Sequence, residues 1–220
     1  DHYMTMPGEH PNKAPEDTGR LSINELMLLM VDQMRVTAQM VLPDEAESFF
    51  SELLNAGKIY VAGAGRSGLV ARAFAMRLMH IGFESYVIGE TITPALSPGD
   101  TLVVFSGSGE TNSVFDVLET ARDLGGRICL ITATPVSRMS RLAHSSVILC
   151  GSQPSDDSLP TQYEVRQITG QYRSVSSSFA PFGTLFETAA LIFSDAIISA
   201  LIEAKHCSLD EARTRLSNVQ

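Results

Sequence analysis

The chain has 220 residues and a formal net charge of −9, with 16 Lys and Arg against 25 Asp and Glu. Because 44% of its residues are hydrophobic, it can bury a core and is not an intrinsically disordered chain. It lacks the basic face or tail that nucleic-acid binding requires. An acidic chain still binds an anionic small molecule where backbone amides and a few Arg side chains act locally.

The three cysteines are far apart and form no C-x-x-C pair: Cys129, Cys150 and Cys207. Cys129 and Cys150 lie in apolar runs, which favours small buried hydrophobic residues over catalysis. The polar residues 1–20 do not resemble a signal peptide, and we expect a flexible leader there. Leu185–Ile202 is strongly apolar but contains two acidic residues, which predicts a buried helix rather than a membrane span. A cytoplasmic protein without membrane contact is the expectation.

Apolar spacing predicts two helices first, over 22–42 and 44–57, and then an alternation of strands and helices. In chain order these are a strand at 58–62, a helix at 67–80, strands at 85–88 and 101–105, a helix at 111–124, a strand at 127–132, a helix at 137–143, a strand at 146–150, a helix at 181–204 and a last helix opened by Ser208 or Asp210.

Strands that alternate with helices indicate right-handed βαβ units. The predicted fold is therefore α/β, a three-layer αβα sandwich with a five-stranded parallel sheet and extra N-terminal helices at 21–57. Residues 21–220 are predicted to form a single domain. Residues 151–179, which hold seven Ser and two Pro, are predicted to form a polar insertion in it. Ligands in such sheets bind beyond the carboxyl ends of the strands.

The first of those ends carries the pattern G-x-G-x-x-G, over Gly63–Gly68. Glu90 follows 22 residues later at the end of the second strand, where a dinucleotide-binding fold keeps the acid that binds the ribose. A nicotinamide enzyme is therefore one hypothesis. A tight strand–helix turn without a ligand explains the glycines equally well.

The third strand runs straight into Ser106-Gly107-Ser108-Gly109-Glu110-Thr111 and then into a helix. Glycines let the backbone approach an anion, amides at a helix N-terminus point toward it, and the hydroxyls of Ser106, Ser108 and Thr111 add donors. A phosphate site is favoured over an ordinary turn. Without a Lys at the required spacing it is not a nucleoside triphosphate loop.

The two loops together resemble the sugar isomerase (SIS) domain family and, within it, the 6-phospho-3-hexuloisomerases. The segments that carry the resemblance run collinearly over about residues 53–203: Gly65-Arg66-Ser67-Gly68, Phe74–His80, Gly89-Glu90-Thr91 with Thr93-Pro94, Ser106–Gly109 and Pro181–Glu187. The resemblance implies a flavodoxin-like sheet and interconversion of 3-hexulose 6-phosphate and fructose 6-phosphate, without metal or redox cofactor.

Glu187 is the candidate base for the proton transfer, since it lies near the start of an otherwise apolar helix and the resemblance assigns the family's catalytic Glu there. The alternative is a first-turn acid that favours the helix dipole. Phosphate is assigned to Ser106, Gly107, Ser108 and Thr111, and the sugar to Gly65, Arg66 and Ser67. Arg66 either binds the substrate's oxygen atoms or phosphate or bonds a neighbouring loop, and Glu90 either binds sugar hydroxyls or balances Arg66. His80 is expected to be structural and His144 solvated.

The C-terminal residues depart from the pattern of the family that the chain resembles. The family's tail carries a candidate acid–base His, and Leu216 stands at the corresponding position; His206 is a possible substitute. The alternatives are therefore a non-catalytic phosphosugar sensor, or an isomerase of a different sugar phosphate. The resemblance also implies a homo-oligomer, a dimer or tetramer. The apolar first helix and C-terminal helix fit burial between its copies, and core packing explains them equally well.

Overall fold

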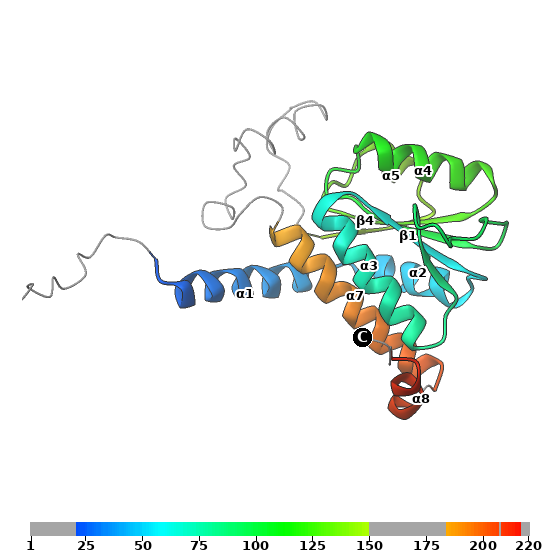
Figure 1. Ribbon diagram of the computed structural model, residues 1–220. Helices are drawn as coiled ribbons and strands as arrows, with labels where there is room; N and C mark the ends of the chain where they lie inside the picture. The colour runs from blue at the N-terminus through cyan, green and yellow to red at the C-terminus, as the bar shows by residue number, and fades with distance from the viewer. Residues whose placement is uncertain (1–20, 150–183, 207, 217–220) are drawn as a thin grey trace, which may run out of the picture.

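The computed structural model describes residues 21–149, 184–206 and 208–216 (Figure 1). The predicted leader at 1–20, the predicted insertion at 151–179, Cys150 and Cys207 lie outside these residues. The described helices are α1 (Ile23–Met40), α2 (Pro43–Leu54), α3 (Gly65–His80), α4 (Asn112–Asp123), α5 (Arg138–Leu142), α7 (Thr184–Ala204) and α8 (Leu209–Thr214). The strands are β1 (Ile59–Gly63), β2 (Ser85–Val87), β3 (Thr101–Phe105), β4 (Arg127–Thr132) and β5 (Ser145–Ile148).

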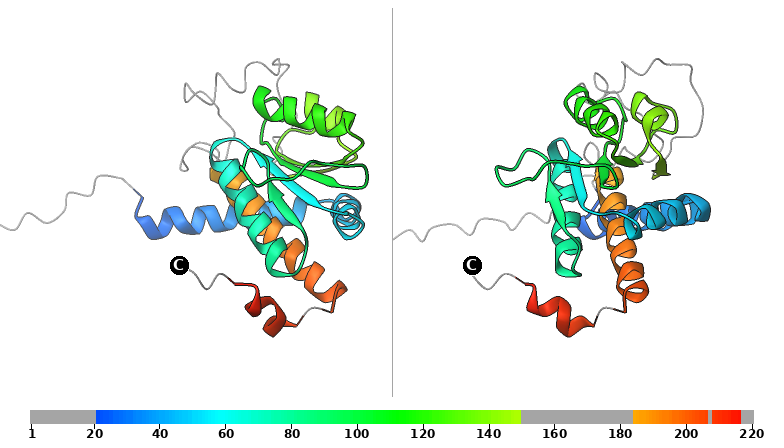
Figure 2. Two further views of the ribbon diagram at one scale, coloured as in Figure 1. Left: turned by 45° about the vertical axis from the view of Figure 1, so that its right-hand side comes forward. Right: turned by 90° about the vertical axis from the view of Figure 1, so that its right-hand side faces the viewer.

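The five strands form one parallel sheet in the order β2-β1-β3-β4-β5, which is the flavodoxin-like order. Helices α4 and α5 cover one face, and α2, α3 and α7 cover the other, with α1 extending outward beside α7 (Figures 1 and 2). The predicted three-layer sandwich with extra N-terminal helices is therefore confirmed.

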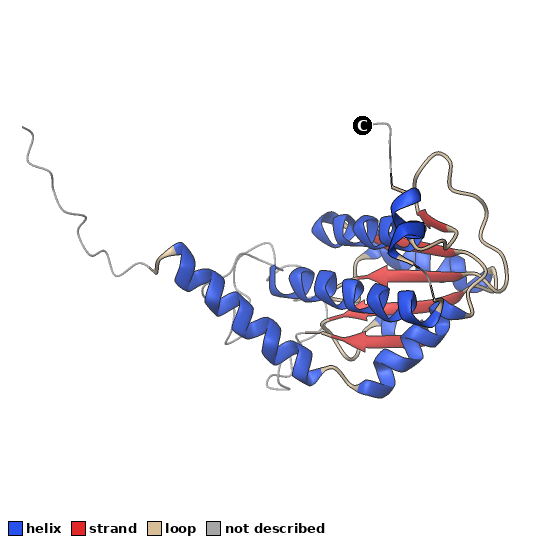
Figure 3. Cartoon of the chain, turned by 90° about the horizontal axis from the view of Figure 1, so that it is seen from below, coloured by secondary structure: helices blue, strands red, loops and turns tan. Residues whose placement is uncertain are grey.

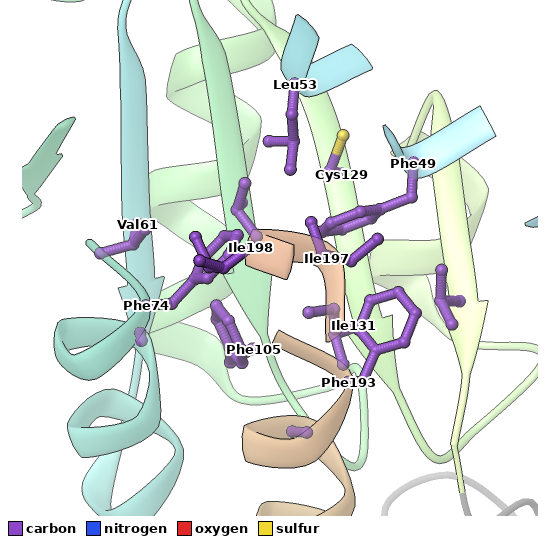
Figure 4. Close-up of a cluster of buried hydrophobic side chains, with 14 of the residues drawn as sticks. Phe49, Leu53, Val61, Phe74, Phe105, Cys129, Ile131, Phe193, Ile197 and Ile198 are labelled. Atoms are coloured by element: carbon purple, nitrogen blue, oxygen red, sulfur yellow. The ribbon is translucent and has the colours of Figure 1, made fainter. Parts of the chain in front are cut away.

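Alternate strand residues feed two separate cores, as the twofold period of a strand requires. Val61, Val103 and Ile131 face α3 and α7 together with the aromatic side chains shown in Figure 4, where Phe74 packs edge-on against Phe105. The intervening residues pack under α4 and α5: Tyr60, Ala62, Leu102, Val104, Ile128 and Leu130. The second core contains no residue of α7, so α7 packs on the same face of the sheet as α2 and α3.

Cys129 lies fully buried in the first core, and burial raises the pKa of its thiol well above the usual range. A thiol held in its protonated form is a poor nucleophile, so the expectation of a structural role is confirmed. Helix α7 is long and apolar enough to cross a membrane by length and composition alone. Phe193, Ile197 and Ile198 are nevertheless buried against the sheet and its helices, which confirms the predicted core helix (Figure 4).

Most element ends fall within two residues of the prediction. Ser22 caps α1, and Ser208, one of the two residues predicted to open the last helix, caps α8; each lies within a capping box. Pro43 opens α2 rather than merely ending α1, because Pro at the first helical position loses no hydrogen bond. Helix α3 begins at Gly65, two residues before the predicted start, so Arg66 belongs to its first turn.

His144 is exposed as predicted, but it also holds the start of β4. Its Nδ1 accepts a hydrogen bond from the Ile128 amide at 2.9 Å. Partial burial, and after it the cations Arg127 and Arg122, lower the pKa of His144 below its usual 6.5. The ring is therefore a structural acceptor that needs its neutral form, a role that the sequence did not reveal.

We expect the His144 contribution to stability to be present above pH 6.5 and to be lost as the pH falls toward the lower folded-state pKa. Below pH 6.5 the unfolded chain binds more protons at this residue, and stability falls where that is so. Urea unfolding of wild type and His144→Asn at pH 7.5 and 5.5 tests this. The free energy of unfolding of wild type should fall relative to that of His144→Asn when the pH is lowered from 7.5 to 5.5. A difference between the two proteins that is the same at both pH values contradicts the prediction.

Candidate functional site

The two loops singled out in the sequence lie side by side at the carboxyl edge of the sheet. Strands β1 and β3 are neighbours, and Gly63 pairs with Phe105 in their register. Parallel neighbours lie about 4.8 Å apart, so the chain leaves both strands at one place. The two loops therefore start side by side at one edge of the sheet, as the strand pattern predicts.

The first loop is shaped by a close approach of β1 to α3. A Cβ on Gly68 would lie 2.7 Å from the Gly63 carbonyl oxygen, and a Cβ on Gly63 would lie 2.9 Å from the Ser67 carbonyl carbon. The first and third glycines of G-x-G-x-x-G are thus required by the strand–helix contact itself. The motif here needs no dinucleotide to explain it.

The second loop folds on its own hydroxyl groups. Ser106 and Ser108 are buried, and their Oγ atoms accept hydrogen bonds from the amides of Gly109 and Glu110, each at 3.1 Å. Among the described residues neither hydroxyl donates a hydrogen bond, so each has a proton to donate to a ligand. The serines predicted to bind phosphate therefore also set the shape of the loop.

The Gly107 carbonyl is fixed toward β4. It accepts hydrogen bonds from the Ala133 amide at 3.0 Å, from Thr132 Oγ1 at 3.2 Å and from Thr134 Oγ1 at 3.0 Å. In a trans peptide the carbonyl and the next amide point in opposite directions, so the Ser108 amide points away from β4. The sequence pattern placed functional residues after Thr132 but did not name these hydroxyls.

Free amides follow along the same loop. Within the described residues, the amides of Ser108 and Thr111 donate no hydrogen bond, and Thr111 is the N-cap of α4 without a side-chain cap bond. Unpaired amides and the positive end of a 12-residue helix form a site for an anion. The arrangement suits a phosphate group held mainly by backbone.

The structure joins the two candidate residues Arg66 and Glu187. Arg66 Nε donates to Glu187 Oε2 at 2.6 Å, linking the first turn of α3 to the first turn of α7. The Arg66 side chain is 60% exposed and that of Glu187 only 11%. The remaining donors of Arg66 are thus open to a ligand, and Glu187 Oε1 makes no hydrogen bond within the described residues.

Two further candidates lie nearby. Ser67 is half-buried in the first turn of α3, beside Arg66. Glu90 does not balance Arg66, because its carboxylate pairs with Arg72, one to two turns further along α3. The alternative that Glu90 balances Arg66 is therefore wrong, because the charge of Glu90 is balanced by Arg72.

The possible substitute for the missing C-terminal His lies at the wrong end of the molecule. His206 follows the last residue of α7, and a helix rising 1.5 Å per residue sets Ala204 about 25 Å from Glu187. Leu216 follows α8 at that same far end, where Arg215 donates to the His80 carbonyl (Figure 2). His206 therefore cannot act with Glu187 of its own chain. His80 is buried, as a structural residue would be.

The SIS domain family model matches residues 52–169, which include both loops. The chain belongs to the SIS domain family. It is 34% identical over 200 residues to 3-hexulose-6-phosphate isomerase of Bacillus subtilis (strain 168), an overlap of 91% of this chain and 100% of that one. It is 36% identical over 198 residues to 3-hexulose-6-phosphate isomerase of Mycobacterium gastri, covering 90% and 92%.

A solved structure agrees with these relatives. A protein of Methanococcus jannaschii, whose crystal structure was taken to infer a molecular function of 3-hexulose-6-phosphate isomerase, superposes with a TM-score of 0.67 at 29% identity. The match covers 90% of this chain and 96% of that one. The likeness therefore extends over the whole sheet and its helices.

Proposed function

We propose that the chain is a phosphosugar isomerase that interconverts 3-hexulose 6-phosphate and fructose 6-phosphate. The observation that carries the proposal is the Arg66–Glu187 pair, which lies at the same sheet edge as the serine–glycine loop. The names of the full-length relatives support it.

The reaction moves a carbonyl between C3 and C2 of one molecule. With the phosphate on the loop amides and the hydroxyls of Ser106 and Ser108, Glu187 removes the C2 proton of 3-hexulose 6-phosphate. A 2,3-enediolate forms, and the free N–H groups of Arg66 stabilise its oxygens. After the proton moves from O2 to O3, Glu187 returns a proton to C3 and gives the 2-ketose. The carbon skeleton is not oxidised overall, so the proposal includes no cofactor or metal.

An assay of purified protein in both directions, with fructose 6-phosphate and 3-hexulose 6-phosphate, tests the proposal. Interconversion supports it. Binding of fructose 6-phosphate by calorimetry without turnover would instead favour the sensor, and turnover of another ketose or aldose phosphate would redirect the substrate. A phosphate ester does not cross a bilayer unaided, so the proposed substrate suits a cytoplasmic enzyme.

The proposal includes a homo-oligomer, with α1 in the contact between copies. Thr37 is the buried residue of α1, and the helix extends away from the sheet (Figures 1 and 3). Large apolar side chains are exposed along it and its flanks: Leu21, Ile23, Met27, Leu28, Leu29, Val31, Val36, Met40 and Leu42. A helix that exposes this many large apolar side chains is normally covered in the assembled protein.

The exposed area is large enough for a stable contact between copies. At on the order of 100 Å² for each side chain covered, α1 offers about 900 Å², and a stable interface needs about 800 Å² from each partner. Leu69, Leu191 and Ile192 extend the apolar surface over α3 and α7. The opposite layer of α4 and α5 exposes fewer such side chains. We therefore assign the contact to the layer that carries Arg66 and Glu187.

We expect the double variant Leu28→Lys, Val31→Lys to separate the oligomer into monomers at micromolar concentration. Two buried, unpaired charges would cost more than the contact gains. Sedimentation velocity gives the mass, and Leu124→Lys, at the C-cap of α4, is the matched exposed control that should leave the mass unchanged. A wild-type monomer, or an unaltered mass in the double variant, contradicts the assignment.

A further inference from the structure

Outside the residues assigned so far, Arg138 makes the densest set of polar contacts near the phosphate loop. It is the first residue of α5, which covers the opposite face of the sheet from α3 and α7, the helices of Arg66 and Glu187. Its amide and Nε donate to the two carboxylate oxygens of Glu110 at 2.8 and 2.7 Å. One terminal nitrogen donates to the Glu110 carbonyl at 2.6 Å and to Asn112 Oδ1 at 2.7 Å. Arg138 thereby ties the end of the loop and the start of α4 to α5.

Two further contacts fix Arg138 and the start of α5 in place. Its guanidinium lies 4.4 Å from the centroid of the Phe115 ring, one turn into α4. The Met139 amide donates to the Gly109 carbonyl at 3.2 Å, so a backbone–backbone bond also joins α5 to the loop. A planar guanidinium with several donors in fixed directions suits this position, and an ammonium group does not.

The charge of Glu110 explains why the contacts of Arg138 with the loop matter for an anion site. Its carboxylate is only 13% exposed and belongs to the loop that would receive phosphate. An unpaired carboxylate there would repel a phosphate dianion, and the repulsion is strong where water is excluded. Arg138 cancels that charge and keeps the carboxylate turned toward α5. Its Nε and one terminal nitrogen are engaged by the loop and α4.

We propose that Arg138 and Glu110 are positioning residues that set the affinity of the loop for the substrate's phosphate. The inference rests on the proposed function for the identity of the ligand. The pair acts through the loop backbone and not through the reacting carbons, because Glu187 and Arg66 come from α7 and α3 on the other face of the sheet. Substrate affinity should therefore depend on the pair, and the chemical step should not.

Arg138→Met is expected to raise the Kd of fructose 6-phosphate about 10- to 100-fold, the effect of losing hydrogen bonds to a charged group. In the turnover assay, KM should rise in parallel and kcat should stay within about threefold. The double variant Arg138→Met, Glu110→Gln removes the uncompensated charge and should recover about threefold or more of the lost affinity. A purely structural role predicts a double variant that binds no better than the single one.

Arg122→Met is the matched control, because Arg122 also links α4 to α5, through the Leu142 carbonyl at 2.6 Å, but at the other end of α4. Its Kd should stay within twofold of wild type. If Arg138→Met does not fold, as judged by thermal unfolding, Arg138→Lys replaces it and should show a smaller loss of affinity.

Calorimetry separates the two proposals. Wild type that fails to bind fructose 6-phosphate contradicts the proposed function. Wild type that binds, with Arg138 variants that bind equally well, overturns the positioning role alone. A fall in kcat at unchanged KM, or an equal loss of affinity in Arg122→Met, overturns it too.

Discussion

Replacement of Glu187 by Gln is expected to lower kcat for the isomerisation about 10²- to 10⁴-fold, the usual contribution of a positioned general base. The amide has nearly the same shape and can still accept the hydrogen bond from Arg66 Nε, now made to Glu187 Oε2 at 2.6 Å. It cannot accept a proton from carbon. KM should stay within about threefold of wild type, because the phosphate loop lies on other elements.

The matched control for this variant is Asp195→Asn. Asp195 lies on the same helix, α7, and also pairs with an Arg of α3, Arg77, at 3.8 Å. That pair is half-exposed on both sides and lies about two turns beyond Glu187, away from the sheet edge that carries the loops. Asp195→Asn should therefore keep kcat within twofold.

Steady-state kinetics of the three proteins, with thermal unfolding as a check on folding, decides the role of Glu187. Full activity in Glu187→Gln would exclude it as the base. A rise in KM with kcat unchanged would make Glu187 a binding residue instead. An equal loss of kcat in Asp195→Asn would show that any α3–α7 ion pair matters only for packing.

Much of the fold could be predicted from local pattern. Short apolar runs such as Leu102–Phe105 are buried on both faces and therefore stand out, and Ser or Thr before a helix gives its start. What stayed hidden depends on partners distant in sequence. His144 accepts a hydrogen bond from the Ile128 amide, and Glu90 pairs with Arg72. Neither contact leaves a periodic pattern in the sequence, so neither could be predicted from it.

In the candidate site, too, the contiguous part could be predicted from the sequence and the contacts between distant residues could not. The serine–glycine loop is contiguous, so its residue types alone predict an anion site. The Arg66–Glu187 contact spans 121 residues and needs two helices to be packed together first. The fastening of the loop by Thr134 and Arg138 likewise depends on the β4–α5 connection, whose sequence carries no motif.

Gly109→Ala is expected to lower the free energy of unfolding by about 2–5 kcal/mol and to weaken the binding of fructose 6-phosphate. Gly109 has φ of +67°, and a Cβ there would lie 2.1 Å from Ser137 Oγ and 2.6 Å from Ser137 Cβ. The methyl group must therefore push the loop away from α5. That movement would disturb the loop amides that are proposed to hold phosphate.

Gly65→Ala separates the two causes. Gly65 also has a positive φ, +55°, but a Cβ there would meet no atom within 4 Å beyond its chain neighbours, so only the backbone cost of about 1–2 kcal/mol remains. Ser137→Gly in the Gly109→Ala background should restore the steric part, because Gly at an N-cap costs only a few tenths of a kcal/mol. Urea unfolding measures all three. Equal losses for Gly109→Ala and Gly65→Ala would mean that the loop yields freely to the methyl group, and a loop that yields so easily could not hold its amides in place for phosphate.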